Sequence, residues 1–141
     1  MSGKPGFKPI LRRRHNLPGS KLNIHESVFF GHDVDLDISG QLEIGAGTFL
    51  SHRAKVLTHQ HNLSGPVTGK VLGPAMTVSI VIGCNVFIGE GAVIMPQVGR
   101  IGDWAVVGAY SVLTKPVGAG EIWAGNPAKF IKMRQGMERT S

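Results

Sequence analysis

Aliphatic residues recur at six-residue intervals along most of this chain, in three blocks. The residues at these intervals are Ile38, Ile44, Leu50 and Val56, then Ile82, Ile88 and Ile94, then Ile101, Val107 and Leu113. A period of six matches neither an amphipathic helix nor a half-buried strand, whose periods are 3.6 and two residues. It is typical of a hexapeptide solenoid, in which short parallel strands wind around a triangular prism and the repeated aliphatic residue points toward the axis.

Small or β-branched residues form a second series, four positions after the aliphatic ones. They are Thr48, Ala54, Val86, Ala92, Val98, Ala105, Ser111 and Val117. Glycine also directly follows several aliphatic positions, where the chain must swing from one face of the prism to the next. The sequence therefore predicts an all-β fold in which inward side chains stack on those of the coils above and below, about 4.8 Å away.

Length and composition favour one domain covering residues 1–141, with 20 glycines serving as corner residues of a turn-dense coil. No apolar run is long enough to span a bilayer, and the basic first residues lack the apolar stretch and cleavage site of a secretory signal. The single cysteine, Cys84, is expected to face outward and has no partner for an internal disulfide. A cytoplasmic location is the expectation.

Three segments depart from the six-residue interval. Residues 1–23 read as an N-terminal arm because their prolines argue against a helix. Residues 62–79 are rich in Gly and Pro and predict a protruding loop. Residues 126–135 predict a short C-terminal helix, with Asn126 as N-cap and Pro127 at the first helical position.

Two irregularities in phase are also visible. Ile24, Phe30 and Leu36 keep a six-residue step that is two residues out of phase with the later series, which predicts a bulge or an imperfect first coil. The step between Ile94 and Ile101 is seven, which predicts an inserted residue at a corner, at Gly99 or Arg100.

The net charge of +6 is concentrated at the two ends of the chain, and the middle is nearly neutral and poor in aromatic residues. Stacking platforms for bases are therefore missing, and no nucleic-acid partner is predicted. An anionic small ligand or a solvated basic arm explains the charge.

The densest polar cluster is Thr58-His59-Gln60-His61-Asn62, just before the predicted loop. Histidine at the rim of a rigid face suits acid and base chemistry near neutral pH, although both rings could also be ordinary surface residues. His52, His59 and His61 could alternatively bind zinc, but the later coils supply no histidine, so no metal is predicted.

Three ordered segments carry a more specific resemblance: IGAGTFLSHRAKVLTHQHNL (44–63), IGCNVFIGEGAVIMPQV (82–98) and LTKPVGAGEIWAGNPAKFIK (113–132). Together they resemble the hexapeptide acetyltransferases of the maltose, galactoside and lipopolysaccharide O-acetyltransferase group. The resemblance implies a left-handed parallel β-helix, a homotrimer with each site between two chains, and acetyl-CoA as co-substrate.

The same resemblance implies roles for individual residues. His61, rather than His59, corresponds to the general base that takes the proton of an acceptor hydroxyl. The region of Glu90, from a neighbouring chain, corresponds to the backbone donor for the oxyanion. The residues implied to contact the cofactor are Phe87 near the reacting centre, Glu90, Ala109 along the pantetheine arm, the pair Thr114 and Lys115, and Lys129 and Lys132 facing phosphates.

The function predicted is that of a CoA-dependent O-acetyltransferase acting on a saccharide or similar polyol. The chain has no counterpart of the helical N-terminal segment found in the sugar-specific members, and its loop is longer, so the acceptor is left open. The alternatives are a non-catalytic structural trimer and a zinc carbonic-anhydrase-like protein.

Overall fold

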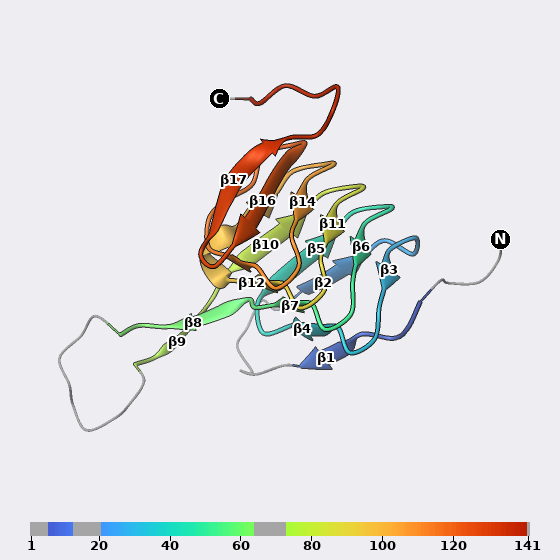
Figure 1. Cartoon of the computed structure of the whole chain (residues 1–141). Helices are drawn as coiled ribbons and strands as arrows, with labels where there is room; N and C mark the ends of the chain where they lie inside the picture. Colours follow the sequence, from blue (N-terminus) through green and yellow to red (C-terminus); the bar gives the residue numbers. More distant parts are fainter. Residues whose placement is uncertain (1–5, 13–20, 64–72, 141) are drawn as a thin grey trace.

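The computed structural model describes residues 6–12, 21–63 and 73–140, which form three mainly parallel β-sheets and one projecting hairpin (Figure 1). The five-stranded sheet runs β1 (Ile10–Arg12), β4 (Asp35–Asp37), β7 (Lys55–Val56), β12 (Val93–Ile94) and β15 (Val112–Leu113). The four-stranded sheet runs β13 (Arg100–Ile101), β10 (Ser79–Ile82), β5 (Gln41–Ile44) and β2 (Lys21–Ile24). The six-stranded sheet runs β17 (Ala128–Met133), β16 (Glu121–Gly125), β14 (Val106–Val107), β11 (Phe87–Ile88), β6 (Phe49–Leu50) and β3 (Phe29–Phe30).

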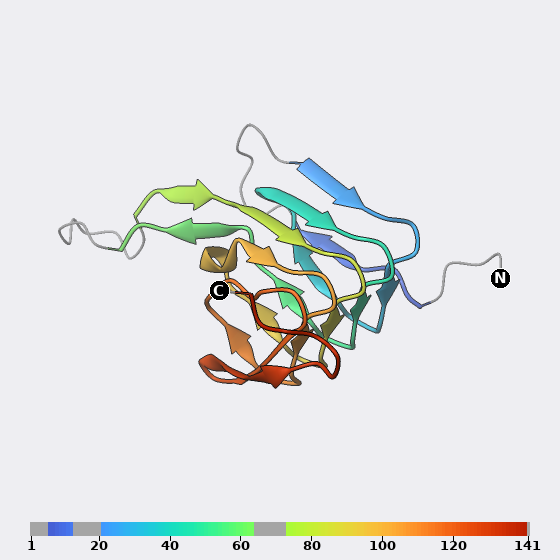
Figure 2. The same ribbon diagram turned by 90° about the horizontal axis from the view of Figure 1, so that it is seen from above.

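Each coil visits the three sheets in turn, so sequence neighbours lie on different faces and residues of successive coils lie side by side (Figure 2). Ile44 pairs with Ile82, Leu50 with Ile88 and Val56 with Ile94 in parallel register. These side chains are at most 1% exposed, as are Ile101, Val107 and Leu113. The prediction of an axial stack of aliphatic residues is confirmed, and the small residues four positions later are buried beside it.

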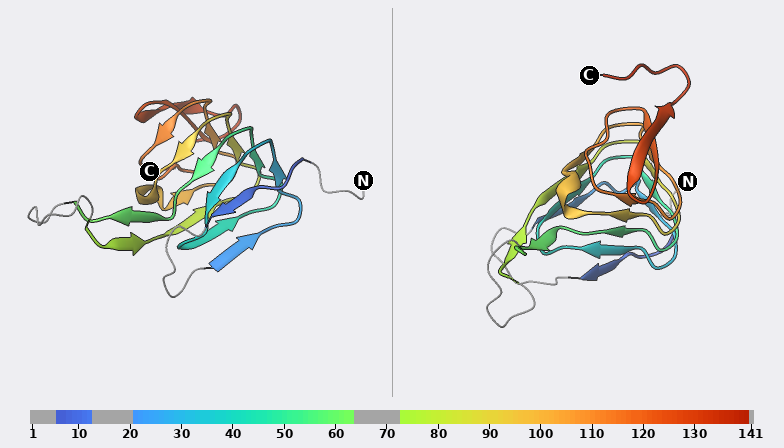
Figure 3. Two further views of the ribbon diagram at one scale, coloured as in Figure 1. Left: turned by 90° about the horizontal axis from the view of Figure 1, so that it is seen from below. Right: turned by 60° about the vertical axis from the view of Figure 1, so that its left-hand side comes forward.

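Two edges of the prism matter for the site. The hairpin corner joins the five-stranded to the four-stranded sheet and comprises residues 37–40, 57–58, 95–99 and 114–116. From it projects the antiparallel hairpin of β8 (His59–His61) and β9 (Ala75–Thr77), visible at the side of the stack in Figure 3. The distal corner joins the six-stranded to the five-stranded sheet and comprises residues 31–33, 51–53, 89–91 and 108–110.

The inserted residue predicted near Val98 is present. Pro96–Val98 form a single 3₁₀ turn, and Gly99 follows with a φ of 70°, after which β13 resumes the register. The two-residue phase shift is also real: Leu36, not Ile38, pairs with Val56. Leu36 and Ile44 occupy stacked positions on either side of the hairpin corner, and the step between them is eight residues instead of six. Ile38 therefore lies in the corner itself, where it is partly buried against the core.

The boundaries of the predicted arm and loop need correction. β1 and the first three residues of β2 lie within the predicted arm, yet these strands pair with β4 and β5 and so belong to the solenoid. β9 and the start of β10 lie within the predicted loop 62–79, because backbone pairing with β8 and β5 continues into it. Residues 1–5, 13–20 and 64–72 of these segments lie outside the described residues.

The predicted helix at residues 126–135 is wrong. Asn126 and Pro127, joined by a cis peptide bond, form the turn between β16 and β17, which pair antiparallel. Two apolar side chains of β17 pack against the core, since Ala128 is buried and Phe130 is partly buried, whereas Ile131 is exposed. The open edge of β16 offers a row of backbone partners, and this pairing outweighs the helical preference of the segment.

Candidate functional site

A buried carboxylate organises the hairpin corner. Asp37 is fully buried, and its Oδ1 accepts the backbone N–H of Ser39 at 3.0 Å, while Oδ2 accepts that of Thr58 at 2.9 Å. The Thr58 hydroxyl donates to the carbonyl of Asp37 at 2.7 Å and accepts the N–H of Gly40 at 2.9 Å. This network fixes the point at which the chain leaves the prism to begin β8.

His59 also contacts this carboxylate, because its Nδ1 lies against Oδ2 of Asp37. Burial alone would raise the pKa of Asp37, but hydrogen bonds from Ser39, His59 and Thr58 outweigh it and hold the pKa below its ordinary value. The carboxylate is therefore ionised and can only accept, so Nδ1 of His59 is the donor.

His61 lies two residues further along β8, on the same side of the strand. Its Nδ1 lies 3.0 Å from the carbonyl oxygen of Gly73, which can only accept, so this nitrogen carries the proton in the neutral ring. The lone pair then resides on Nε2, as a general base requires. The ring is half-buried and lines an open hollow with Gln60, Asn62, Leu63 and Met76.

Glu90 and Ala109 lie on the distal corner, one coil apart, and backbone hydrogen bonds connect this corner from coil to coil. Tyr110 Oη donates to Glu90 Oε2 at 2.9 Å, and the guanidinium of Arg53 contacts the same oxygen. The hydroxyl of Tyr110 and the charge of Arg53 lower the pKa of Glu90. Arg53 and Tyr110 hold left-handed backbone conformations, with φ of 61° and 54°.

Phe87 lies on the outer face of the six-stranded sheet and is 40% exposed. Its ring centroid lies 5.5 Å from that of Phe49, which in turn stacks on Phe29. The register places Phe87, Val106, Ile122 and Lys132 in one outward row across adjacent strands. Lys129 lies on β17 opposite Ala124, and both lysines are exposed.

Thr114 and Lys115 follow β15 at the hairpin corner, two coils beyond the base of β8. Lys115 lines a groove at the C-terminal end of the solenoid together with Arg100 and Arg139. Arg139 is paired there with the buried carboxylate of Glu121 at 2.9 Å. The groove also contains the carboxylate of Asp103, so its three cations lie among two acidic residues.

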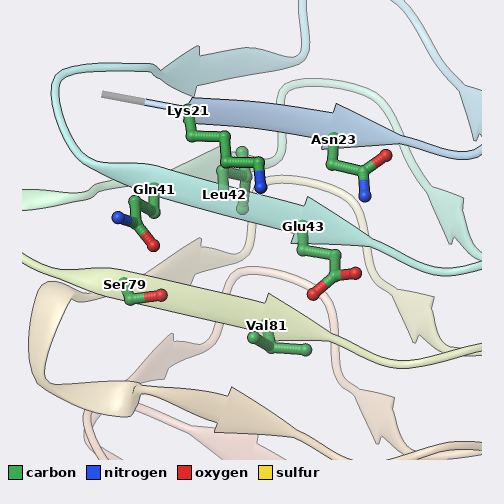
Figure 4. A pocket seen from close by; sticks show the side chains of 7 residues that line it. All are labelled: Lys21, Asn23, Gln41, Leu42, Glu43, Ser79 and Val81. Carbon is green, nitrogen blue, oxygen red and sulfur yellow. The ribbon is translucent and has the colours of Figure 1, made fainter. Parts of the chain in front are cut away.

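The structure therefore divides the predicted site residues into two groups on one chain. Thr114 and Lys115 lie at the hairpin corner, and His61 lies on β8, which projects from that corner. Phe87, Glu90, Ala109, Lys129 and Lys132 lie on the six-stranded sheet or the distal corner. The five-stranded sheet separates these two edges within a protomer. A separate shallow hollow on the four-stranded sheet contains none of these residues; it is lined by Lys21, Asn23, Gln41, Leu42, Glu43, Ser79 and Val81 (Figure 4).

The three histidines named as possible zinc ligands, His52, His59 and His61, do not converge within one chain. His52 lies on the distal corner, where its Nδ1 accepts the backbone N–H of His32 at 2.7 Å, so it is not with the other two. Within residues 6–12, 21–63 and 73–140, no group of three or more His, Cys, Asp or Glu side chains is placed to hold a metal ion. No helix in this same part of the chain has the length and apolar character needed to cross a bilayer.

Sequence reasoning missed three residues of this region: Asp37, Arg53 and Tyr110. Asp37 had a local signal, because an aspartate two residues before a serine is typical of a turn in which the carboxylate accepts a backbone N–H. Arg53 and Tyr110 had none, since their left-handed conformation and their contacts with Glu90 depend on the stacking of separate coils.

Residues 79–115 match the bacterial transferase hexapeptide family (six repeats). The chain is 30% identical over 115 residues to the mitochondrial gamma carbonic anhydrase 2 of Arabidopsis thaliana, covering 75% of this chain and 41% of that protein. It is 38% identical over 80 residues to a 2,3,4,5-tetrahydropyridine-2,6-dicarboxylate N-acetyltransferase of Staphylococcus aureus, covering 57% of this chain and 33% of that protein. The chain thus spans less than half the length of these two curated relatives.

Solved structures share the fold. A maltose O-acetyltransferase from Clostridium difficile superposes with a TM-score of 0.68 and 24% identity, covering 92% of this chain and 68% of that one. A hexapeptide-repeat acetyltransferase from Vibrio cholerae, solved with acetyl coenzyme A, gives 0.70 and 23%, covering 91% and 69%. Residues 79–115 thus carry the hexapeptide repeat of bacterial transferases, and the chain has the same fold as these hexapeptide acetyltransferases.

Proposed function

We propose that this protein transfers an acetyl group from acetyl-CoA to a hydroxyl of a saccharide or similar polyol. The observation that carries the proposal is the setting of His61: its Nδ1 is held by the carbonyl of Gly73 at the outer end of the paired hairpin strands, and its ring faces an open hollow. A neutral imidazole held in this tautomer has the lone pair of Nε2 available for a proton.

In the proposed reaction, Nε2 of His61 takes the proton of the acceptor hydroxyl as its oxygen attacks the thioester carbonyl carbon. The carbon–sulfur bond then breaks, and the CoA thiolate takes the proton back from the imidazolium. No covalent acyl-enzyme forms. The oxyanion requires a backbone donor, which the proposal takes from the region of Glu90.

We propose that the solenoid is left-handed and that three copies of the chain form a homotrimer. The cofactor then lies between two protomers. One chain presents His61, Thr114 and Lys115 on one edge and Phe87, Glu90 and Ala109 on another, so a complete site requires a second copy. Phe29, Phe49 and Phe87 form a partly exposed stack on the six-stranded sheet. This stack supports a protein contact there, because partly exposed aromatic side chains are well suited to interfaces. Lys115, Lys129 and Lys132 would attract the phosphates of CoA.

The test is release of free thiol from acetyl-CoA with maltose, a methyl galactoside and an aminosugar as acceptors. We expect turnover with a hydroxyl acceptor and loss of at least about a thousandfold in His61→Ala, because a general base and its positioning are removed together. His25→Ala is the matched control, since His25 lies between β2 and β3, at a different corner of the prism from the hairpin, and contacts Ser27. Full turnover by His61→Ala refutes the assignment of the base.

The similarity to a gamma carbonic anhydrase supports a second candidate, a zinc hydratase assembled between chains. Metal analysis of the purified protein tests it. Stoichiometric zinc together with CO₂ hydration, and no thiol release, would favour this candidate. Absence of acetyl-CoA binding by calorimetry, with no metal, would instead indicate a structural trimer.

A further inference from the structure

We propose that Asp37 and His59 form a positioning pair that holds the ring of His61 in its reactive orientation. This inference rests on the proposed function, because it concerns how the proposed base is set. Its geometry combines a fully buried carboxylate at the hairpin corner, an imidazole hydrogen-bonded to it, and the ring of His61 next along the same strand.

Asp37 is held in place at the hairpin corner by its hydrogen bonds. Its two oxygens accept backbone N–H groups of Ser39 and Thr58, and the side chain has no exposure to water. Burying a carboxylate costs several kcal/mol unless hydrogen bonds satisfy it, so such a group stays where its donors lie. The later coils turn the hairpin corner at residues 95–99 and 114–116 with no acidic residue. The carboxylate is therefore not required for turning this corner of the prism.

His59 is fixed to the prism through both its ring and its backbone. Its Nδ1 is bound to the Asp37 carboxylate, and its side chain is only 14% exposed. Thr58, the preceding residue, is locked through its hydroxyl to the carbonyl of Asp37 and the N–H of Gly40. Both the backbone and the ring of residue 59 are thus fixed to the solenoid, although β8 itself projects away from it.

The imidazole rings of His59 and His61 are in direct contact. The ring of His59 meets that of His61 edge-on, with a centroid separation of 5.6 Å and an interplanar angle of 83°. The Nδ1 of His61 is held on the other side by the carbonyl of Gly73, across the hairpin. His61 thus lies between a rigid ring anchored to the prism and the opposite strand of the hairpin, and this arrangement restricts its side-chain rotation.

The experiment separates a positioning role from a catalytic one with two variants of the same residue. His59→Asn keeps an N–H donor near the place of Nδ1 but removes the ring, whereas His59→Phe keeps the ring but removes the donor. His25→Asn serves as the matched control. Each is assayed by thiol release with acetyl-CoA and maltose, and circular dichroism and sedimentation check that the fold and assembly are retained.

We expect kcat of His59→Asn to fall about tenfold with KM for acetyl-CoA unchanged, because the base is present but loosely oriented. His59→Phe should retain more activity than His59→Asn. The fall of kcat toward low pH should persist in both variants, because the proposed base His61 is unchanged. Wild-type kcat in His59→Asn overturns the proposal, and so does loss of this pH dependence in both variants, which would make His59 the base.

NMR spectroscopy of the imidazole nitrogens tests the positioning role of His59 even when maltose is not an acceptor. Long-range ¹H–¹⁵N correlation spectra report which nitrogen of each imidazole carries the proton. We expect one Nδ1–H tautomer for His61 in the wild type and a tautomer mixture in His59→Asn. An unchanged His61 signal pattern overturns the positioning role, whereas failure of the proposed function is seen separately, as full turnover in His61→Ala.

Discussion

At the scale of single residues, Asp37 shows how an internal charge is maintained in a small solenoid. Its side chain is completely shielded from water, yet the surrounding donors favour the ionised form. Each donor belongs to the hairpin corner or to β8, so the charge stabilises this corner rather than the axial stack.

The stability of the protein should therefore depend on pH through Asp37. Because the pKa of Asp37 is lower in the folded protein than its ordinary value of 3.8, its contribution is present above that value and is lost as the pH falls through the folded pKa. We expect Asp37→Asn to cost about 3 kcal/mol of unfolding free energy near neutral pH. Urea unfolding should show this difference shrinking as the pH falls below 3.8 and through the folded pKa. A difference independent of pH would contradict this account.

At the scale of elements, the close approach of successive corners limits which residues they can contain. A Cβ added to Gly89 would lie 2.6 Å from the backbone nitrogen of Ala109 on the next coil. Gly99 has a different constraint: its φ is 70°, and an added Cβ would meet no described atom within 4 Å. The first glycine is required by contact between coils and the second by backbone conformation.

Alanine at these two glycines should separate the two effects. We expect Gly99→Ala to cost about 1 kcal/mol, the penalty of a left-handed conformation for a residue with a Cβ. Gly89→Ala should cost about 3 kcal/mol, because neighbouring backbones must move apart along the stack. Urea unfolding at matched protein concentration measures both. Equal costs would show that the coils accommodate the extra methyl group without separating.

At the scale of the whole molecule, the two groups of predicted site residues lie on different edges of one prism. A trimer in which one protomer supplies His61 and its neighbour supplies Ala109 would unite them. A homotrimer and a cytoplasmic location both stay predictions here, and the first can be tested by complementation.

Two inactive variants should restore activity when mixed. His61→Ala lacks the proposed base, and Ala109→Trp fills the proposed path of the pantetheine arm. After joint unfolding and refolding in equal amounts, random trimers should regain about one quarter of wild-type thiol release, since a site needs one intact edge from each protomer. If each site lies within one chain, the mixture stays inactive. Sedimentation of each variant alone checks that assembly is retained.

The sequence by itself determined the solenoid, because a six-residue repeat of aliphatic side chains has one main structural interpretation. Each repeated aliphatic residue marks a position that faces the axis. The sequence also predicted an inserted residue at Gly99 or Arg100, and it marked the polar run that contains His61. Only the tertiary structure decided that residues 128–133 form a strand, since the free edge of β16 competes with local helical preference. It likewise decided the pairing of Asp37 with His59 and of Arg53 with Glu90, because these partners come from different coils, 22 and 37 residues apart, and meet only after stacking.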